Sequence, residues 1–369
     1  MHGIHASLRG LLNQEDDVRP LLSFIAILAL LSGAPLNADA CTTFLLEGES
    51  GLRVAKSYDW NMGRGLVLHN KAGMRKRSLA LKPSDVSFDW TSRHASVTFN
   101  QYGRGMPNGG MNDAGLVIEI MWLKSARYPA PDARPSANEL QWIQHQLDTR
   151  SSVAELLEHA GELRVSGIHG RVHYLACDAS GACAALEYLD GELHVASGDA
   201  LPVSVLTNHT YAKSLKHHGA TRGPTKGTRS LARFVNAAHG VARRAGTPDP
   251  TSEAFEVLES VRQGDYTKWQ IVYDPHAQRV AFRTTGNPAI KTLDVAGLSR
   301  ECSEAVVYVD MDEPVGGDVG HRWAPWTPAI NRELLMETLA PLAQVLPPGL
   351  STAITAWALE QRCAPSGRP

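Results

Sequence analysis

A cysteine that follows a run of small residues near the start of the chain could act as a nucleophile. The segment reads Ala38-Asp39-Ala40-Cys41-Thr42-Thr43-Phe44, and an uncharged apolar run from Leu21 to Leu31 precedes it. That order is typical of an export signal that a peptidase cuts after small residues. Cleavage after Ala40 would place a thiol and a free α-amine, with pKa values of about 8.5 and about 8, on Cys41. A nucleophile joined covalently to a base is one route to an activated nucleophile.

On this segment alone, Cys41 need not be a nucleophile. Cleavage could fall before a cysteine by chance. A lipoprotein also begins its mature chain with cysteine, but that class requires leucine or a similar residue three places earlier, where this chain has Ala38. The rest of the sequence has to decide among these three possibilities.

The length and charge of the chain limit the classes of protein that it can represent. Removal of the first 40 of 369 residues would leave 329, enough for one large domain or two small ones. The net charge is −2 and like charges form no block, so neither nucleic acid nor a membrane surface is predicted as a partner. We predict a removed signal peptide over residues 1–40, a single domain over 41–369, and a periplasmic or secreted location.

Five cysteines are present, which is an odd number in the oxidising setting that an export signal implies. Cys177 and Cys183 flank a tight-turn sequence and could face one another across a hairpin. Cys302 and Cys363 could form a second bridge, although all four thiols could instead be reduced and buried. Either arrangement leaves Cys41 unpaired, as a nucleophile must be.

A zinc site could be imagined from two histidines and the first cysteine pair, namely His169, His173, Cys177 and Cys183. Their spacing matches no closed zinc pattern. We therefore predict no metal site.

Short strands and amphipathic helices must position Cys41. β-Forming residues and turn signals predict strands over residues 41–47, 52–58, 66–69, 78–81, 95–99, 116–123, 172–177, 182–188, 192–196, 203–206, 270–273, 280–283 and 289–293. Capping boxes predict helices that begin at Ser136-x-x-Glu139 and Ser152-x-x-Glu155. Helical periodicity predicts three more, over 230–242, 252–261 and 330–340, and 217–227 is predicted to be a loop. This order favours an α+β fold with antiparallel sheets and outer helices over regular βαβ alternation.

The first predicted hairpin ends in Lys56-Ser57-Tyr58-Asp59-Trp60. Residues an odd number of positions apart on a strand point to opposite faces unless a bulge intervenes. Lys56 and Asp59 could therefore both face Cys41 only if the strand bends near Tyr58. The alternative is an ordinary surface ion pair.

Eight motifs occur together in one order along the chain. They are Cys41-Thr-Thr-Phe44, Lys56-x-x-Asp-Trp60, Gly110-Met-Asn-Asp-Ala-Gly-Leu116, Asn138-Glu-Leu140, Asp178-Ala-Ser-Gly181, Leu206-Thr-Asn208, Arg233-Phe-Val235 and Thr267-Lys-Trp-Gln-Ile-Val-Tyr273. Together they resemble the choloylglycine hydrolase family, which contains bile salt hydrolases and penicillin V acylases. The resemblance covers roughly residues 41–295 and leaves 300–369 as a less recognisable C-terminal extension. It implies the αββα sandwich of N-terminal-nucleophile hydrolases.

The resemblance also implies roles for individual residues. Cys41 matches the family's N-terminal nucleophile, and Asp59 matches the aspartate that orients the α-amine. Asn208 matches the oxyanion asparagine, and the backbone N–H of Trp122 matches the second oxyanion donor. Arg233 matches an arginine near the site. Tryptophan at position 122 resembles the penicillin V acylases of Gram-negative bacteria, several of which also cleave acyl homoserine lactones.

This chain departs from the family in two ways. Lys56 stands where arginine is usual, which keeps a positive charge but loses the planar guanidinium fork. The segment between Asn208 and Arg233 is short and lacks the assembly loop of bile salt hydrolases, which weakens the case for their tetramer. Trp60 and Trp122 are candidate substrate-binding residues, although both could be plain core aromatics.

The predicted function is hydrolysis of a linear amide bond through a thioester on Cys41. The N-acyl substrates implied are penicillin V, conjugated bile acids or acyl homoserine lactones, with no metal or organic cofactor. Lys56 and Arg233 are expected to lower the pKa of the thiol. The oligomeric state stays open. The alternative is a non-catalytic periplasmic binding protein on the same scaffold, which the Lys56 departure favours and the retention of Cys41 disfavours.

Overall fold

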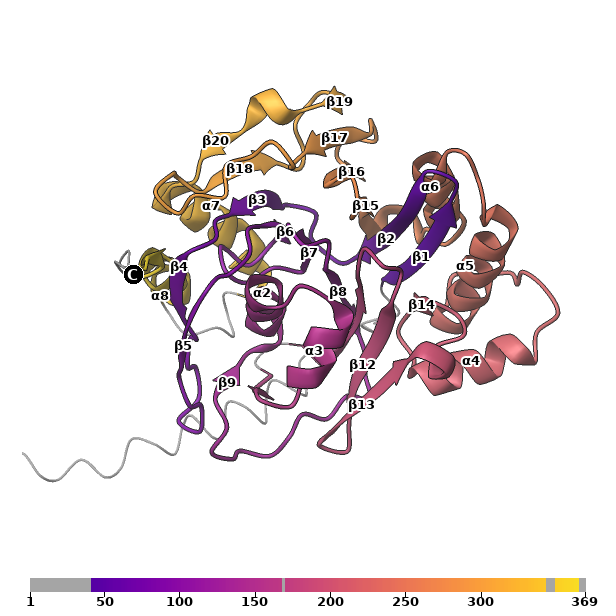
Figure 1. The fold of residues 1–369 in the computed structure, drawn as a ribbon, viewed down its shortest axis with the longest axis horizontal. Coiled ribbons are helices and arrows are strands. Elements are labelled where there is room, and N and C mark those ends of the chain that lie inside the picture. The colour runs from indigo at the N-terminus through magenta and orange to yellow at the C-terminus, as the bar shows by residue number, and fades with distance from the viewer. Residues whose placement is uncertain (1–40, 168–169, 343–348, 365–369) are drawn as a thin grey trace, which may run out of the picture. The chain divides into compact units, whose positions relative to one another are not determined.

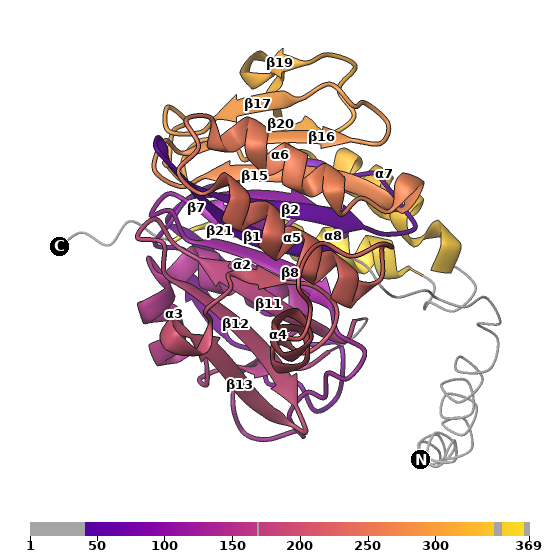
Figure 2. The same ribbon diagram turned by 90° about the vertical axis from the view of Figure 1, so that its right-hand side faces the viewer.

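Two mainly antiparallel sheets face one another, and helices cover their outer sides (Figure 1 and Figure 2). The computed structural model describes residues 41–167, 170–342 and 349–364, and these belong to one compact unit. The predicted α+β class and four-layer αββα arrangement are confirmed. None of the helices in these ranges is both long and apolar enough to cross a lipid bilayer.

The first sheet has seven strands in the order β14-β1-β2-β15-β16-β17-β19. Helices α5 and α6 pack on its outer side against β1 and β2, and α4 packs against α5. The bounds of the strands are Val205–Leu206, Thr42–Gly48, Gly51–Asp59, Thr267–Asp274, Arg279–Thr284, Lys291–Asp294 and Gly317–Asp318, and those of α4, α5 and α6 are Tyr211–Gly219, Ser230–Arg244 and Pro250–Ser260.

The second sheet has nine strands in the order β13-β12-β11-β8-β7-β6-β3-β18-β20, and α2 packs on it. The bounds of the strands are Glu192–Ser197, Cys183–Leu189, Val172–Cys177, Val117–Trp122, Gly109–Asn112, Ser96–Asn100, Leu66–Asn70, Val307–Asp310 and Ala324–Pro325, and those of α2 and α3 are Glu139–Thr149 and Val153–His159. The C-terminal extension thus adds β19 to the edge of the first sheet and β18 and β20 to the edge of the second, since β19 pairs with β17, β18 with β3 and β20 with β18.

The remaining elements are short. One small sheet pairs β9 with β10, another joins β21, β4 and β5, and α7 and α8 pack together in the C-terminal extension. The bounds are Ser136–Ala137, Arg164–Val165, Arg362–Cys363, Met74–Arg77 and Asp89–Thr91 for these strands, Pro328–Leu339 and Leu350–Leu359 for α7 and α8, and Gly198–Ala200, Gly264–Tyr266, Gly320–Arg322 and Ala340–Leu342 for the 3₁₀ helices.

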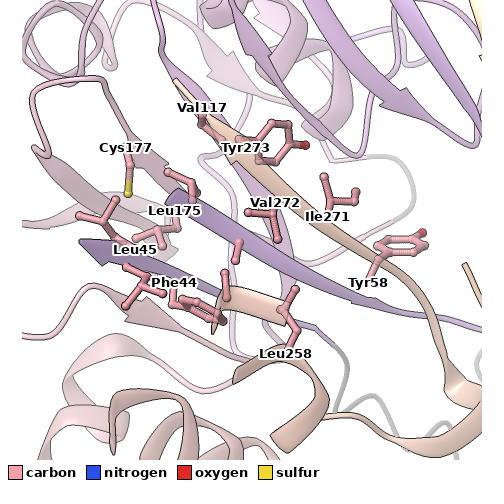
Figure 3. Packing of buried hydrophobic residues seen from close by; sticks show 14 of the residues in the cluster. Phe44, Leu45, Tyr58, Val117, Leu175, Cys177, Leu258, Ile271, Val272 and Tyr273 are labelled. Carbon is pink, nitrogen blue, oxygen red and sulfur yellow. The ribbon is translucent and has the colours of Figure 1, made fainter. Parts of the chain in front are cut away.

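The main core lies between the two sheets and continues under α5 and α6. Alternate residues of a strand point to opposite faces, so a strand that is covered on both sides can bury nearly every side chain. Strand β2 does so from Leu52 to Asp59. Figure 3 shows part of this core, with Phe44 and Leu45 of β1, Leu175 of the opposite sheet and Leu258 of α6. A fully buried side chain such as Phe44 contributes roughly 1.5–3 kcal/mol.

Three local predictions were wrong for identifiable reasons. The strand predicted at 78–81 lies instead at Met74–Arg77, where buried Lys76 takes an inward position because Asp148 pairs with it at 2.8 Å. The first capping box does not form, since Asn138 caps α2 and Ser136 lies in β9. The predicted loop at 217–227 begins inside α4, whose last turn holds cationic side chains that suit a helix C-terminus.

Both bridges that the sequence allowed are disulfides. Cys177 and Cys183 pair across the β11–β12 hairpin with their Cα atoms 4.1 Å apart. Cys302 and Cys363 join the end of the chain to the segment before β18, with Cα atoms 5.5 Å apart. The zinc alternative is wrong because these thiols are oxidised and His173 uses both ring nitrogens in hydrogen bonds; His169 lies outside the described residues.

The two bridges should differ in their effect on stability. In the chain-entropy account a disulfide stabilises more when it closes a longer loop, about 4 kcal/mol for a separation of 61 residues and about 2 kcal/mol for one of 6. We expect replacement of Cys302 and Cys363 by serine to lower the free energy of unfolding more than the same change at Cys177 and Cys183. Chemical unfolding of both double variants measures this, and an equal or reversed order would contradict it.

Buried His145 should make the fold sensitive to acid. It lies 5.4 Å from the rings of Phe88 and Trp90, and burial, Arg150 and Lys76 lower its pKa from 6.5 to about 3. Below pH 6.5 the unfolded chain binds a proton at this position that the folded protein does not. The free energy of unfolding therefore decreases as the pH is lowered, down to about pH 3. We expect His145 to lower the free energy of unfolding by about 2–3 kcal/mol at pH 4.5 relative to pH 7.

Denaturant unfolding at pH 7 and pH 4.5 measures this loss. The His145→Gln variant should lose less stability than the parent over that interval because an amide does not titrate there. Parallel losses in both proteins would show that His145 is not the acid-sensitive group.

Candidate active site

Cys41 stands immediately before β1, and its backbone nitrogen is held by a carboxylate. The nitrogen donates to Asp59 Oδ2 at 2.9 Å. Cys41 is buried and is the single free cysteine of the described residues. Its φ of 74° lies in the left-handed region, which non-glycine residues seldom occupy outside turns and functional sites.

Asp59 ends β2 and is completely buried. Besides the Cys41 nitrogen, Gln263 Nε2 donates to Oδ2 at 2.7 Å, Ser57 Oγ donates to Oδ1 at 2.9 Å, and the Thr267 hydroxyl donates to Oδ1. A buried carboxylate is expensive unless hydrogen bonds satisfy it, and these four donors do so. Asp59 is therefore held in one orientation toward Cys41.

A bulge in β15 lies opposite Asp59, but it does not bring Lys56 and Asp59 to one side of β2. The β2–β15 register shifts between Thr267, which pairs with Asp59, and Trp269, which pairs with Tyr58. The extra residue in β15 disrupts the ladder locally. Asp59 shares a side with Ser57 and reaches the backbone nitrogen of Cys41, whereas Lys56 points to the opposite side, so the two residues flank Cys41.

Lys56 lies in the sandwich interior and is not part of a surface ion pair. Its ammonium group donates to the Ile120 carbonyl and lies 3.4 Å from Glu119 Oε2. Glu119 also accepts a hydrogen bond from the Tyr273 hydroxyl at 2.6 Å. A Cβ atom at Gly109 would lie 2.3 Å from the Glu119 carboxyl group, which explains a glycine at that position.

Lys56 and Arg233 both lower the pKa of the Cys41 thiol, as predicted, but the net effect of the site is to raise that pKa. Burial is the largest cause and raises it; the charge of Lys56 lowers it, the charge of Asp59 raises it, and the charge of Arg233 lowers it. The two cations act in the expected direction, but desolvation of the thiolate outweighs them. A thiol in this environment needs a base to become nucleophilic near neutral pH.

Arg233 connects the nucleophile to the candidate oxyanion residue. This side chain of α5 is completely buried. It donates to the Cys41 carbonyl oxygen, to Thr42 Oγ1 at 2.7 Å and to Asn208 Oδ1 at 2.6 Å. Because a guanidinium group can only donate, Asn208 must turn its oxygen toward Arg233 and its Nδ2 group the other way.

Sheet pairing brings Asn208 to Cys41. Leu206 of β14 pairs with Thr43 of β1, and the same antiparallel register continued by two residues sets Asn208 opposite Cys41. Asn208 Nδ2 donates one hydrogen to the Trp122 carbonyl at 2.9 Å. Its second hydrogen is the candidate oxyanion donor.

The Trp122 peptide group faces the same place. Just beyond the β8–β11 ladder, Leu123 N donates to Arg171 O. Because direction alternates along a strand, the N–H and C=O of Trp122 point away from β11. The β7–β8 pairing ends at Glu119, three residues earlier. The N–H and C=O of Trp122 therefore point toward the side on which Asn208 lies.

Two tryptophans stand next to these residues. The rings of Trp60 and Trp122 have centroids 6.0 Å apart, and Trp60 Nε1 donates to the Tyr102 hydroxyl at 3.0 Å. Both tryptophans are partly exposed. Trp60 packs against the core that contains Cys41, and the role of both tryptophans in substrate binding stays a prediction.

Comparison with known proteins gives relatives in sequence and in structure. No protein-family model matches the sequence. A penicillin V acylase of Pectobacterium atrosepticum is 25% identical over 201 residues, which are 49% of this chain and 53% of that protein. The chain thus spans about half the length of that curated relative.

Solved structures extend the similarity. The structure of penicillin V acylase from Agrobacterium tumefaciens matches with a TM-score of 0.69 and 25% identity, over 78% of this chain and 98% of that one. A variant of conjugated bile acid hydrolase from Clostridium perfringens shares the fold at a TM-score of 0.60 and 14% identity, over 73% and 97% of the two chains.

The predicted resemblance to the choloylglycine hydrolases is confirmed. The sandwich is that of the N-terminal-nucleophile hydrolases. All six residues that this resemblance assigned to catalysis, Cys41, Lys56, Asp59, Trp122, Asn208 and Arg233, meet at one end of the two sheets, and Trp60 adjoins them.

Several residues that support this site were not identified from the sequence. Gln263 and Thr267 hold Asp59, Ser230 Oγ accepts from the Asn208 backbone nitrogen at 2.9 Å, and Glu119 pairs with Lys56. Only Glu119 gave a signal, as a lone charge within an apolar strand. The others are ordinary polar residues whose partners are far away in sequence.

Removal of the Lys56 charge should shift the pH dependence of Cys41 reactivity. Lys56→Met alone would leave Glu119 buried without a cation, so the test variant combines it with Glu119→Gln. Lys56 lowers the pKa of the thiol. In a plot of alkylation rate against pH, the rising limb should therefore lie at higher pH when the Lys56 charge is lost.

Iodoacetamide labelling of Cys41 across pH 6–10 measures the shift. Lys56→Arg keeps the charge and should keep the limb near the parent position. An unchanged limb in the double variant would remove Lys56 from the electrostatics of the thiol.

Proposed function

We propose that the protein hydrolyses linear amide bonds of N-acyl compounds, with Cys41 as the N-terminal nucleophile of the exported, mature chain. The observation that carries the proposal is the bond between the Cys41 backbone nitrogen and buried Asp59. After cleavage that nitrogen would be an α-amine held within reach of its own thiol. The two disulfides support an oxidising, extracytoplasmic location.

The first step forms the acyl-enzyme. The α-amine accepts the thiol proton, and Sγ attacks the substrate carbonyl carbon while the π electron pair moves to the oxygen. Asn208 Nδ2 and the Trp122 N–H stabilise that oxyanion. The C–N bond then breaks, and the leaving amine takes the proton from the α-ammonium group, which leaves a thioester on Cys41.

The second step releases the acid. Water attacks the thioester carbonyl, and the α-amine accepts its proton. The same two donors stabilise the second oxyanion, after which the C–S bond breaks and the thiolate regains the proton. Asp59 keeps the amine in place in both steps, and Arg233 keeps the Asn208 amide from turning over.

The class of substrate follows from the surface beside Cys41. Trp60 and Trp122 offer an apolar, aromatic face to an acyl group. Penicillin V, conjugated bile acids and acyl homoserine lactones all carry an apolar acyl or steroid part on an amide. The relatives named for penicillin V and bile acids support the same class.

Amide hydrolysis by the mature protein tests the proposal. The enzyme is purified after export and its first residue is identified by mass as unmodified Cys41. It is then assayed for released amine from penicillin V, glycine- and taurine-conjugated bile acids and long-chain acyl homoserine lactones. We expect turnover of at least one compound.

Two variants assign that turnover to the site. Cys41→Ala should abolish it, and Asn208→Ala should lower kcat about 100- to 1000-fold, as loss of one oxyanion donor usually does. Turnover that persists in Cys41→Ala would refute the mechanism. Specific binding of these compounds without turnover would favour a non-catalytic binding protein.

A further inference from the structure

A histidine outside the catalytic set lies behind the oxyanion residue. His173 of β11 is completely buried. Its Nδ1 lies 2.8 Å from Glu187 Oε1, and Glu187 is its cross-strand partner on β12. Its Nε2 lies 2.6 Å from the backbone oxygen of Thr207, the residue before Asn208. Both ring nitrogens therefore take part in hydrogen bonds.

The partners fix the proton on Nε2. A backbone carbonyl oxygen can only accept, so Nε2 must carry a hydrogen. Glu187 Oε1 also accepts from the Tyr211 backbone nitrogen at 2.9 Å, and a second proton lies between Oε1 and Nδ1. Whichever atom of the pair holds that second proton, the hydrogen bond from Nε2 to Thr207 is kept.

This pair holds the chain on both sides of Asn208. His173 binds Thr207, one residue before it, and Glu187 binds the nitrogen of Tyr211, three residues after it. Ser230 binds the Asn208 nitrogen from α5. The turn that carries the oxyanion donor is thus fixed by polar contacts from the opposite sheet as well as from α5.

We propose that His173 and Glu187 are positioning residues that set the place of the Asn208 donor by holding Thr207 and Tyr211. The inference rests on the proposed hydrolase function and adds a buried pair to its machinery. Placement of a donor at the developing oxyanion is what gives such a group its effect on rate. The hydrogen bonds of the pair run to Thr207 and Tyr211 and not to Cys41.

Glu187→Gln separates this role from simple packing, because it keeps the shape of the side chain. The amide oxygen must still accept from the Tyr211 nitrogen, so it also accepts from Nδ1–H. A neutral imidazole then has no hydrogen on Nε2, and two acceptors face one another at Thr207. An added proton on His173 restores the bond.

The groups around His173 come from several elements. Glu187 faces it from β12, and Met121 is its partner on β8, with the Lys56 ammonium group 3.4 Å from Met121 Sδ. Arg233 lies on the other side of Asn208.

The expected result is a loss of kcat in Glu187→Gln of about 10- to 100-fold at pH 8, smaller than the loss of the donor itself. KM should change little. The loss should be partly rescued as pH falls toward 6, relative to the parent at each pH. The alkylation rate of Cys41 with iodoacetamide should match the parent, because the thiol environment is untouched.

His145→Gln is the matched control, since it also replaces a buried histidine but lies on α2, away from Asn208. It should keep kcat and show no rescue at low pH. Parallel losses of kcat and of Cys41 alkylation in Glu187→Gln would mean general distortion and would overturn the proposal, as would unchanged kcat.

A measurement without substrate keeps the inference independent of the proposed activity. In ¹⁵N-histidine-labelled parent protein, His173 Nε2 should stay protonated from pH 6 to pH 9, whereas in Glu187→Gln the neutral ring should carry its hydrogen on Nδ1. An Nε2 that is unprotonated in the parent would overturn the positioning role even if the enzyme is active. Failure of every amide substrate, with this NMR pattern intact, would count against the hydrolase function alone.

Discussion

The site depends on one buried carboxylate. Asp59 is buried at the end of β2, where four hydrogen-bond donors take the place of water. The Cys41 nitrogen is one of these donors. Three donors come from β2 itself and from the segment around the start of β15, so the β2–β15 pair and its bulge prepare a place for the fourth. An uncompensated buried carboxylate would cost several kcal/mol, and this cost ties the residue before β1 to the end of β2.

Charge around the thiol follows from the same enclosure. Lys56 and Arg233 approach Cys41 from opposite sides, yet burial keeps the thiol protonated. Such a site keeps its nucleophile uncharged until a base acts, and the proposed base is released only when the preceding residues are removed. Glu119 forms an ion pair with Lys56 inside the sandwich, so the lysine charge near the thiol is paired.

Much of this could be predicted from sequence because the motif residues carry their own local signal. Cys41 follows a cleavage pattern, Asp59 and Asn208 end strands, and the helical periodicity of α5 indicates where Arg233 lies. What could not be predicted depends on partners distant in the chain. Lys76 takes an inward position only because Asp148 is there, and His173 serves Asn208 only because β11 passes behind it. Helix α4 was also missed, because the polar composition of its exposed face is similar to that of a loop.

The bridge between Cys302 and Cys363 has a further consequence for the C-terminal extension. It closes a covalent loop that contains β18, α7 and α8. A protease that cut the chain once anywhere inside this loop would not release a fragment, because the two pieces would stay linked through sulfur. Nicked protein would therefore migrate as one band without reductant and as two with it, and the strands that the extension adds to both sheets would remain tethered in place.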